Sequence, residues 1–352
     1  MSTLSTSTQQ QVRDYYGRVL KSTKDLKTDA CCSTDAMPPH LRRILDQVAG
    51  EIRERFYGCG SPIPPAIEGC TVLDLGCGTG RDAYLCARLV GPQGRVIGVD
   101  MTEAQLEVAR RHETDQARRF GYDRPNTLFH HGYMEDLAAL GIEDGSVDVV
   151  ISNCVINLAP DKERVFAEIF RVLKPGGELY FSDIFADRRL PAEWMEDPVL
   201  VGECLAGAMY VEDFRRLIGS FGIPDVRVVA SREVRVDNPE LARRVGAVRF
   251  RSMTVRVFKL DDLEDRCEDY GQVAYYRGTM PFEPHRFVLD DHHVFETDRP
   301  VPVCGNTASM LTRTRFASHF RVDGDRRKHF GLFPCGTKEA ADGGCDPGTA
   351  CC

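Results

Sequence analysis

The sequence predicts an α/β fold built on a doubly wound parallel sheet, with a helical lead-in before it and a small α+β region after it. Between Gly69 and about Phe185, short β-branched and apolar runs alternate with longer segments of helical spacing. A glycine-rich loop ending at Gly80 joins the first run to the first helical segment, and an acidic residue, Asp100, ends the second run. This alternation is typical of a parallel sheet covered by helices.

The expected elements follow from the pattern in chain order. Strands are expected at 71–75, 95–99, about 127–129, 147–151, 178–185, 225–230 and 254–260. Helices are expected at 81–90, from Thr102 to about Phe120, through the apolar positions between 165 and 173, and at 211–221. Thr102 and Gln105 suit a capping box at the start of the second helix. Glycine- and proline-containing segments at 91–94 and 175–177 are expected to end the first and third helices.

Length and composition limit the class of protein. The chain has 352 residues, of which 42% are hydrophobic and 28% charged, with a net charge of −8. Such a chain forms about two domains or three small ones and is neither wholly disordered nor fibrous. Its mild acidity argues against a nucleic-acid or membrane-surface partner, and no window approaches the ~20 apolar residues of a membrane helix. The Ser/Thr/Gln-rich start is not a secretory signal, so we expect a cytoplasmic protein. The sequence has no coiled-coil pattern and no obvious dimer seam, so we expect a monomer.

The glycine loop indicates the kind of ligand. Its spacing is Gly-x-Gly-x-Gly over Gly76–Gly80, which differs from the dinucleotide fingerprint, and no Lys-Ser/Thr pair follows, which excludes a P-loop. Asp100 lies 20 residues after Gly80, where a carboxylate can accept hydrogen bonds from both ribose hydroxyls. Asp74 adds a negative charge beside the loop, which would repel a pyrophosphate but not a cationic sulfonium ligand. The remaining alternative is a tight turn in an unrelated α/β protein.

This combination resembles the class I S-adenosylmethionine-dependent methyltransferases, whose core is Rossmann-like. The resemblance implies that the cofactor is held by Asp74, Gly76, Cys77, Gly78, Gly80, Asp100, Met101, Met134, Glu135, Ser152 and Asn153. Met134 would pack on the adenine, and Glu135 or Asp136 would bond its amino group. Either acid could equally be a helix N-cap. Ser152 and Asn153 would lie beside the methionine part of the cofactor.

Fourteen cysteines are unusual for a chain of this length that does not need disulfides to fold. Cys154 follows the strand at 147–151, and ligands of doubly wound sheets bind outside the carboxyl ends of the strands. Cys59 lies in a glycine-flanked loop, Cys204 follows the strand at 178–185, and Cys31-Cys32 is a vicinal pair. Zinc is one reading, but the Cys-x-x-Cys pairs of a structural zinc site are absent. The other reading is a soft thiophilic atom held by about three thiolates. We expect the thiols of Cys70, Cys77, Cys86 and Cys267 to be small buried hydrophobes instead.

Longer strings make the resemblance closer. The chain resembles the arsenite methyltransferases in Tyr15-Tyr16-Gly17, Asp25-Leu26-Lys27-Thr28, Tyr57-Gly58-Cys59-Gly60, Asp74 to Asp82, Gly98 to Thr102, Ser152 to Leu158 and Gly202-Glu203-Cys204-Leu205. The match covers about residues 12–260 and continues loosely to about 335. It implies that Cys59, Cys154 and Cys204 are the catalytic thiols that hold trivalent arsenic. Cys31 would take part in redox turnover, with Cys32 as the alternative, and Tyr57 would lie near the substrate.

The function implied is transfer of methyl groups from S-adenosylmethionine to thiol-bound trivalent arsenic. Arsenite and methylarsenite, as thiol conjugates, would be the substrates, and detoxification the outcome. Methyl transfer oxidises arsenic, so disulfide formation among the cysteines would reduce it again, and glutathione or thioredoxin would then reset the enzyme. One competing reading is a methyltransferase for an organic molecule with structural cysteines. Another is a protein that binds zinc or a metalloid without turnover.

The expected domain organisation has five parts. These are a helical cap with substrate-site cysteines at 1–68, the S-adenosylmethionine-binding core at 69–190, an arsenic-binding insertion with the last strands at 191–261, a small α+β domain at 262–334 and a flexible Cys-containing tail at 335–352. The pairs His130-His131 and His292-His293 are not expected to bind metal, because adjacent strand residues face opposite sides. Trp194 either covers the site or packs on the domain surface.

Overall fold

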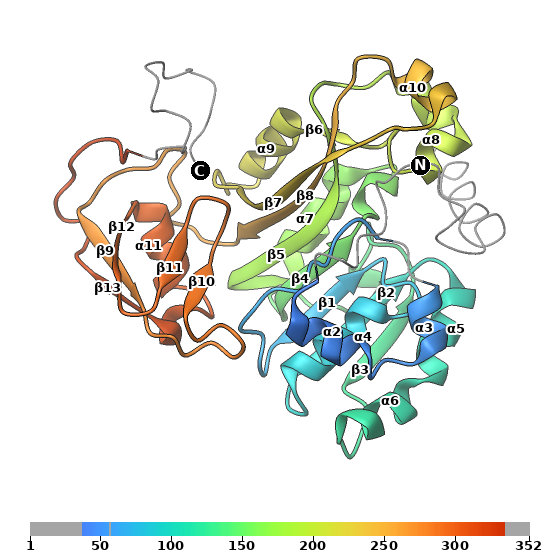
Figure 1. Cartoon of the computed structure of the whole chain (residues 1–352), viewed down its shortest axis with the longest axis horizontal. Helices are drawn as coiled ribbons and strands as arrows, with labels where there is room; N and C mark the ends of the chain where they lie inside the picture. The colour runs from blue at the N-terminus through green and yellow to red at the C-terminus, as the bar shows by residue number, and fades with distance from the viewer. Residues whose placement is uncertain (1–36, 56–57, 335–352) are drawn as a thin grey trace.

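The computed structural model describes residues 37–55 and 58–334. Within these residues, a mixed sheet has the strand order β3-β2-β1-β4-β5-β8-β7, with β6 paired to β5 (Figure 1). The strands are β1 (Thr71–Leu75), β2 (Arg95–Asp100), β3 (Thr127–His131), β4 (Val147–Asn153), β5 (Leu173–Ala186), β6 (Met209–Tyr210), β7 (Arg227–Val234) and β8 (Phe250–Phe258). Strands β1 to β6 pair in parallel, whereas β8 runs antiparallel to β5 and β7. The predicted doubly wound α/β sheet is therefore confirmed.

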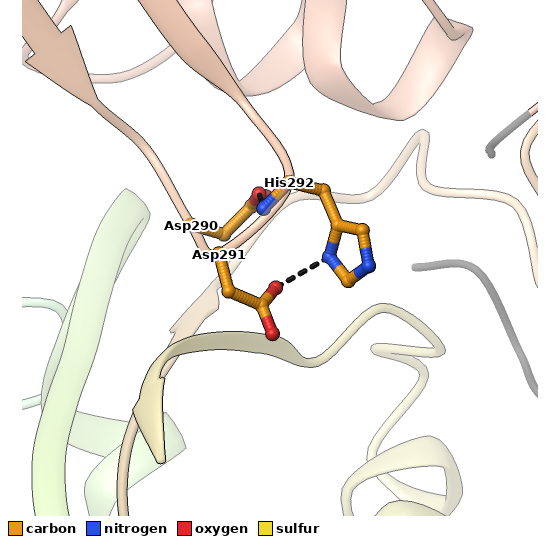
Figure 2. Close-up of side chains that lie close together, drawn as sticks. All are labelled: Asp290, Asp291 and His292. Carbon is orange, nitrogen blue, oxygen red and sulfur yellow. Dashed lines mark hydrogen bonds and ion pairs between the residues drawn. The ribbon is translucent and has the colours of Figure 1, made fainter. Parts of the chain in front are cut away.

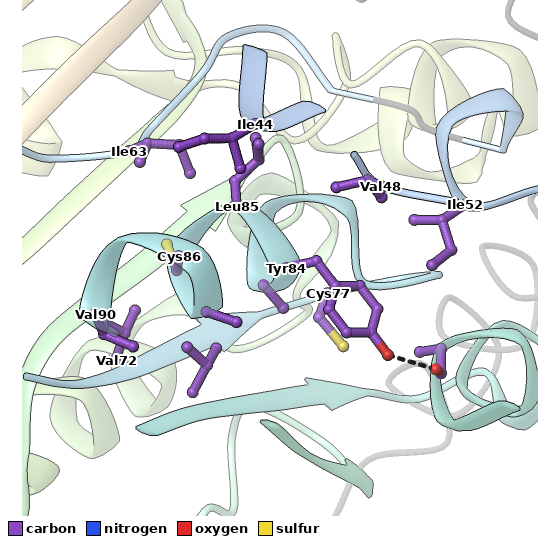
Figure 3. Close-up of a cluster of buried hydrophobic side chains, with 14 of the residues drawn as sticks. Ile44, Val48, Ile52, Ile63, Val72, Cys77, Tyr84, Leu85, Cys86 and Val90 are labelled. Carbon is purple, nitrogen blue, oxygen red and sulfur yellow. Dashed lines mark hydrogen bonds between the residues drawn. The ribbon is translucent and has the colours of Figure 1, made fainter. Parts of the chain in front are cut away.

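Helices cover both faces of this sheet. The described helices are α2 (Pro39–Leu45), α3 (Gly50–Glu54), α4 (Arg81–Val90), α5 (Glu103–Arg111), α6 (Glu113–Phe120), α7 (Lys162–Val172), α8 (Pro198–Gly202), α9 (Val211–Ser220), α10 (Pro239–Val245) and α11 (Gly305–Thr312). Helices α2 to α6 pack on one face, and Figure 3 shows their apolar cluster, in which the Tyr84 hydroxyl donates to the carbonyl of Ala109 at 2.7 Å. Helices α7 and α9 pack on the other face. Alternate residues of β1 point to opposite faces of the sheet, so that Val72 packs in the cluster under α2 to α6 and Leu73 packs in the cluster under α7 and α9.

Residues 262–334 form a second, smaller core. It contains the antiparallel sheet β12-β9-β13 and the hairpin β10-β11. Its strands are β9 (Gln272–Tyr276), β10 (Arg286–Val288), β11 (Val294–Glu296), β12 (Pro300–Val303) and β13 (Phe320–Asp323). This unit lies beyond the β5-β8-β7 side of the main sheet (Figure 1). The buried Arg256 guanidinium donates to the carbonyl of Leu289 at 2.6 Å, and Arg227 pairs with Asp290 at 3.0 Å, so charged groups of the main sheet hold the small unit.

Three local predictions are wrong. The helix expected from Thr102 to Phe120 is interrupted at His112, which divides it into α5 and α6. Thr102 is the N-cap of α5, but its side chain makes no capping hydrogen bond. The Asp100 carboxylate instead accepts from the Thr102 amide at 2.8 Å and replaces the predicted capping box. The segment 175–177 does not lie between helix and strand, because β5 already begins at Leu173.

No helix among the described residues is long and apolar enough to cross a membrane.

Candidate functional site

The glycine loop between β1 and α4 is folded tightly against the end of β2. Gly76 has φ +70°, and a Cβ there would lie 2.5 Å from the side chain of Val155. The amides of Gly76 and Cys77 both donate to the carbonyl of Val99, at 2.8 and 3.1 Å. The Gly78 amide donates to the Asp100 carboxylate at 2.8 Å. The backbone therefore passes close to the strand ends, with no side chain in the way of a ligand.

A cleft with about 1150 Å³ of open space lies outside this loop, at the carboxyl ends of β1, β2 and β4. We call it the cofactor cleft. Of the residues expected to hold the cofactor, Asp74, Gly76, Cys77, Gly78, Asp100, Met101, Met134, Glu135 and Asn153 line it. Gly80 and Ser152 do not. Gly80 is the N-cap of α4, and the Ser152 hydroxyl turns to the carbonyl of Leu75 at 3.2 Å. Ser152 is therefore not part of the cleft lining, and its place beside the cofactor stays a prediction.

Four carboxylates, those of Asp74, Asp82, Asp100 and Glu135, line the cofactor cleft together with the guanidinium groups of Arg55 and Arg81. Asp74 is buried, and burial, together with the nearby charges of Asp82 and Asp100, raises the pKa of its carboxyl well above the usual value. Its Oδ2 atom is buried and has no hydrogen-bond partner among the described residues. A buried carboxylate oxygen without a partner is costly, and a cationic ligand in the cleft would compensate for it. This donor set fits a sulfonium or ammonium group.

Asp100 ends β2 beside the loop. Its two oxygens accept from the amides of Gly78 and Thr102, at 2.8 Å each. Burial raises the pKa of its carboxyl, against the opposing effect of these two bonds. The Thr102 side chain also bonds this carboxylate. A carboxylate has about four acceptor positions, so it keeps an acceptor position for a hydroxyl group of a ligand.

The acidic segment after β3 lies at the edge of the cofactor cleft. Glu135 and Met134 line the cleft, whereas Asp136 does not and instead lies 3.8 Å from Arg164. Neither acid is a helix N-cap, because Leu137 occupies that place before the short 3-10 helix at 138–140. Between the two alternatives left open by the sequence, the geometry favours Glu135 as the group that faces a ligand.

Cys59, Cys154 and Cys204 lie together in one apolar cluster, here called the cysteine cluster. Cys59 and Cys154 form a disulfide with a Cα–Cα distance of 5.8 Å, and the Cys204 sulfur lies 3.5 Å from the carbonyl oxygen of Cys154. They come from the loop after α3, the end of β4 and the end of α8. All three are buried, with 4%, 3% and 0% of their surfaces exposed. The expected convergence of these sulfurs at the sheet edge is thus what the structure has.

The backbone at two of these cysteines adopts the left-handed conformation, which residues other than glycine rarely adopt. Cys154 has φ +57° and Cys204 has φ +58°. Residues other than glycine held in the left-handed region cost about 1–3 kcal/mol each. Such strain persists where the surroundings impose it, and it is frequent at functional sites.

Asn153 joins the cysteine cluster to the cofactor cleft. Its Oδ1 atom accepts from the amides of Cys59 and Gly60, at 3.1 and 3.3 Å. Its Nδ2 group donates to the carbonyl of Gly60 at 3.0 Å and to the Asp82 carboxylate at 2.8 Å. The sequence placed Asn153 only beside the cofactor. The structure adds that it holds the Cys59 loop in place.

Two further side chains near the cluster were not predicted to have a role. Asp183 of β5 is fully buried and accepts from the amides of Asn157 and Ile184, at 3.1 and 2.8 Å. Burial raises the pKa of its carboxyl to about 7. The sequence signal for this site was the polar pair Ser182-Asp183, which interrupts the apolar run of β5. Trp194 packs against the cysteine cluster and is partly buried, so of the two readings for this residue the structure favours a place beside the site.

Several predicted residues lie outside the described part of the chain. They are Cys31, Cys32, Tyr57 and the cysteines of the tail, Cys335, Cys345, Cys351 and Cys352. Among the others, Cys77 and Cys86 are buried free thiols whose pKa is raised by burial, and Cys70 is partly buried with its pKa raised to about 11 in the same way. Cys267 is disulfide-bonded, so its prediction as a free buried thiol is wrong.

A separate group of possible metal ligands lies in the small unit. Figure 2 shows Asp290, Asp291 and His292 close together on the turn between β10 and β11. The Asp290 carboxylate is already bound to Arg227 at 3.0 Å and to His293 at 2.8 Å. This acid anchors the small unit to the sheet and is not a vacant ligand.

Comparison with known proteins agrees with this geometry. Residues 67–222 match a family model described as a methyltransferase domain, and residues 269–348 match one described as the arsenite methyltransferase C-terminal domain. The chain is 54% identical to an arsenite methyltransferase of Aquipseudomonas alcaligenes, over 93% of this chain and 94% of the relative. It is 40% identical to that of Homo sapiens, over 96% and 87%. A solved structure of CrArsM, an arsenic(III) S-adenosylmethionine methyltransferase from Chlamydomonas reinhardtii, has a TM-score of 0.82 at 53% identity and covers 85% of this chain and 100% of that one.

Proposed function

The chain belongs to the arsenite methyltransferase family, and on that premise we propose how its residues carry out the reaction. The enzyme methylates arsenite with S-adenosylmethionine as the methyl donor. Our proposal concerns the groups that hold the substrate and return it to the trivalent state. The observation that carries it is the meeting of Cys59, Cys154 and Cys204 in one buried cluster, with Cys154 also lining the cofactor cleft.

In the reduced enzyme, the three thiolates bind As(III) in a trigonal pyramid that leaves the arsenic lone pair free. Thiolates are the soft ligands that suit such an atom, and binding itself removes the thiol protons. Because Cys154 belongs to the wall of the cofactor cleft, the lone pair faces that cleft. Apolar neighbours such as Ile184 and Leu205, both fully buried, keep water away from the bound arsenic. Tyr57, two residues before Cys59 in the sequence, would help to shield the substrate from water.

The cofactor residues act by holding and orienting. Bound S-adenosylmethionine supplies a methyl group already activated on a sulfonium, so the reaction needs no general base. Asp100 would accept from the ribose hydroxyls, Glu135 would face the adenine amino group, and Met134 and Met101 would pack against the nucleoside. Asp74 offers its unpartnered oxygen to the positive end of the ligand. Alignment of the methyl with the lone pair can account for up to ~7–11 kcal/mol of the barrier.

The cysteines also balance the electrons. Methyl transfer uses the arsenic lone pair, so As(III) becomes As(V). Two thiolates then give two electrons to arsenic and form a disulfide, which returns arsenic to As(III). The Cys59–Cys154 pair has the geometry of such a disulfide. Two equivalents of a thiol, or one protein dithiol, then reduce it and leave the enzyme ready for another methyl. Cys31, or its neighbour Cys32, is a further partner in this cycle. Detoxification of arsenic is the physiological role that we propose.

Serine substitutions test the thiolate ligands. Cys154→Ser and Cys204→Ser should each abolish arsenite methylation while S-adenosylmethionine affinity, measured by calorimetry, changes less than about twofold. Cys304→Ser is the matched control. That buried sulfur is the N-cap of α11 and accepts from the Thr307 amide at 3.5 Å, a role that serine performs equally well. Methylation at the parent rate in Cys154→Ser would contradict the proposal.

Binding is measured apart from turnover. The chain has one tryptophan, and Trp194 packs against the cysteine cluster, so its fluorescence should change when arsenite is added to the reduced protein. Loss of this change in Cys204→Ser, with the parent response in Cys304→Ser, is the expected result.

A further inference from the structure

A second cavity lies on the far side of the cysteine pair from the cofactor cleft. It has about 1500 Å³ of open space. Most of its wall comes from three parts of the chain, namely residues 38–41 with 59–68, the strands β7 and β8 at 229–232 and 252–256, and the small unit at 281–288, with Leu89 and Tyr180 completing it. Among its wall residues, the rings of His40 and Phe282 stack with their centroids 4.6 Å apart. The methyl-transfer chemistry proposed above makes no use of this space.

The disulfide spans the wall between the two spaces. Cys154 lines the cofactor cleft and not the second cavity, whereas Cys59 lines the second cavity and not the cleft. The two residues lie within 5.8 Å of each other by their Cα atoms. A molecule in the second cavity therefore approaches the disulfide from the Cys59 side, and a molecule in the cleft approaches it from the Cys154 side.

Thiol–disulfide exchange has a directional requirement. The attacking sulfur approaches the attacked sulfur in line with the S–S bond, opposite the leaving sulfur. A thiol in the second cavity lies beside Cys59 and not beside Cys154, so we take Cys59 as the attacked sulfur and Cys154 as the leaving thiolate. After methyl transfer the cleft is where the demethylated cofactor lies, so the second cavity is the route that does not depend on its release.

The lining of the second cavity fits a small molecule with peptide groups. Apolar residues such as Ile63, Pro64 and Val288 form most of it, with the hydroxyls of Ser61 and Thr254 near the cysteine. The Ser61 hydroxyl oxygen is buried and has no hydrogen-bond partner among the described residues. Of the open space, about 400 Å³ forms the cavity proper, and apolar cavities of roughly 300–1,000 Å³ with a few polar groups are typical of small-ligand sites. A folded thiol protein is far too large for such a space.

We propose that the second cavity is the entry and binding site of a small-molecule thiol of the glutathione class, which attacks the sulfur of Cys59. This inference rests on the disulfide-linked cycle proposed above. The thiolate forms a mixed disulfide with Cys59 and releases the Cys154 thiolate. A second thiol attacks the bound thiol's sulfur, forms the oxidised thiol dimer and releases the Cys59 thiolate. Two electrons pass from two thiols to one disulfide, and methylation and reduction use opposite sides of one wall.

The test uses the oxidised full-length chain without arsenic or cofactor, and glutathione as the probe. Loss of the Cys59–Cys154 cross-linked peptide is followed by mass spectrometry. The rate should saturate with glutathione concentration, and trapping should find glutathione on Cys59. Saturating S-adenosylhomocysteine should leave the rate unchanged.

Variants at the rim of the cavity make the test specific. Ala230 and Ser231 are exposed residues of β7 that line the second cavity, and a tryptophan at either position should obstruct it. Ala230→Trp, or Ser231→Trp if the first does not fold, should slow reduction by glutathione about tenfold. Glu233→Trp is the matched control, because Glu233 is exposed on the same strand and does not line the cavity.

The inference would be overturned by parent-like reduction of both rim variants, by protection of the parent by S-adenosylhomocysteine, or by glutathione found on Cys154. Reduction by thioredoxin with no reaction of glutathione would overturn it as well. The proposed function is examined separately, by one round of arsenite methylation with pre-reduced Ala230→Trp. If Ala230→Trp methylates arsenite at the parent rate, the proposed function stands whatever the glutathione result. If the parent protein does not bind arsenite, both the proposed function and the inference about the second cavity are wrong.

Discussion

Replacing Asn153 with alanine removes the hydrogen bonds that hold the Cys59 loop against the sheet. The amide side chain bonds the amides of Cys59 and Gly60, the Gly60 carbonyl and the Asp82 carboxylate. Neutral hydrogen bonds contribute about 1 kcal/mol each, and one to a charged group about 2 kcal/mol. Water can replace part of this at the partly buried Gly60. We therefore expect the free energy of unfolding to fall by about 3–5 kcal/mol.

The same change should weaken arsenic binding. Without Asn153 the Cys59 loop must become ordered when arsenic binds, and that ordering opposes binding. We expect the dissociation constant for arsenite, measured by Trp194 fluorescence in the reduced protein, to rise about tenfold. Urea unfolding under reducing conditions gives the stability without a contribution from the disulfide.

Asn126→Ala is the control for this prediction. The Asn126 amide donates to the carbonyls of Ala87 and Gly91, at 2.9 and 3.0 Å, away from the cofactor cleft. It should lower stability by about 2 kcal/mol and leave arsenite affinity unchanged. The reasoning is refuted if Asn153→Ala is as stable as the parent to within 1 kcal/mol, or if both variants bind arsenite equally well.

Three other predictions concern neighbouring groups. Burial raises the pKa of Asp183 from 3.8 to about 7, so between these pH values the folded protein keeps a proton that the unfolded chain releases. Stability should therefore fall as pH rises through this window, by up to about 4 kcal/mol, and urea titrations of Asp183→Asn should lack that slope. Asp74→Asn should weaken S-adenosylmethionine about tenfold and S-adenosylhomocysteine less, because the latter lacks the sulfonium charge; equal losses by calorimetry would argue against the charge pairing. Gly207→Ala would place a Cβ 2.0 Å from the carbonyl oxygen of Asn157, so the nearby arsenic ligand Cys204 should be displaced and methylation lost. Gly219→Ala is the control, because a Cβ at Gly219 has open space around it, and this variant should remain active.

The parts of the site that were predictable depend on chain topology. The carboxyl ends of parallel strands meet at one edge of a sheet, so the sequence alone predicted Asp100 and Cys154 at the same cleft. The glycine loop was recognisable because its spacing reflects backbone that must pass close to other groups. Its residues line the cleft as expected, apart from Gly80.

The parts that were not predictable depend on tertiary packing. The sequence around Ser152 and Asn153 does not indicate that the Ser152 hydroxyl bonds the carbonyl of Leu75 while the Asn153 side chain bonds the Cys59 loop. The second cavity exists because three distant segments pack around it. Local competition also matters, since the Asp100 carboxylate occupied the Thr102 amide that a capping box would have used.

The positive φ angles at Cys154 and Cys204 lower the stability of the fold at two residues that the proposed chemistry requires. Glycine would relieve the backbone strain of either turn, but it would also leave a small cavity in a buried apolar cluster and lose more entropy on folding, so Cys154→Gly or Cys204→Gly should change the stability of the reduced protein by no more than about 1 kcal/mol while losing arsenic. An organism no longer exposed to arsenic would thus meet no folding barrier to discarding these sulfurs. Selection for detoxification alone would be left to maintain them, and a descendant with glycine at both turns would keep the fold and the cofactor cleft but have no substrate.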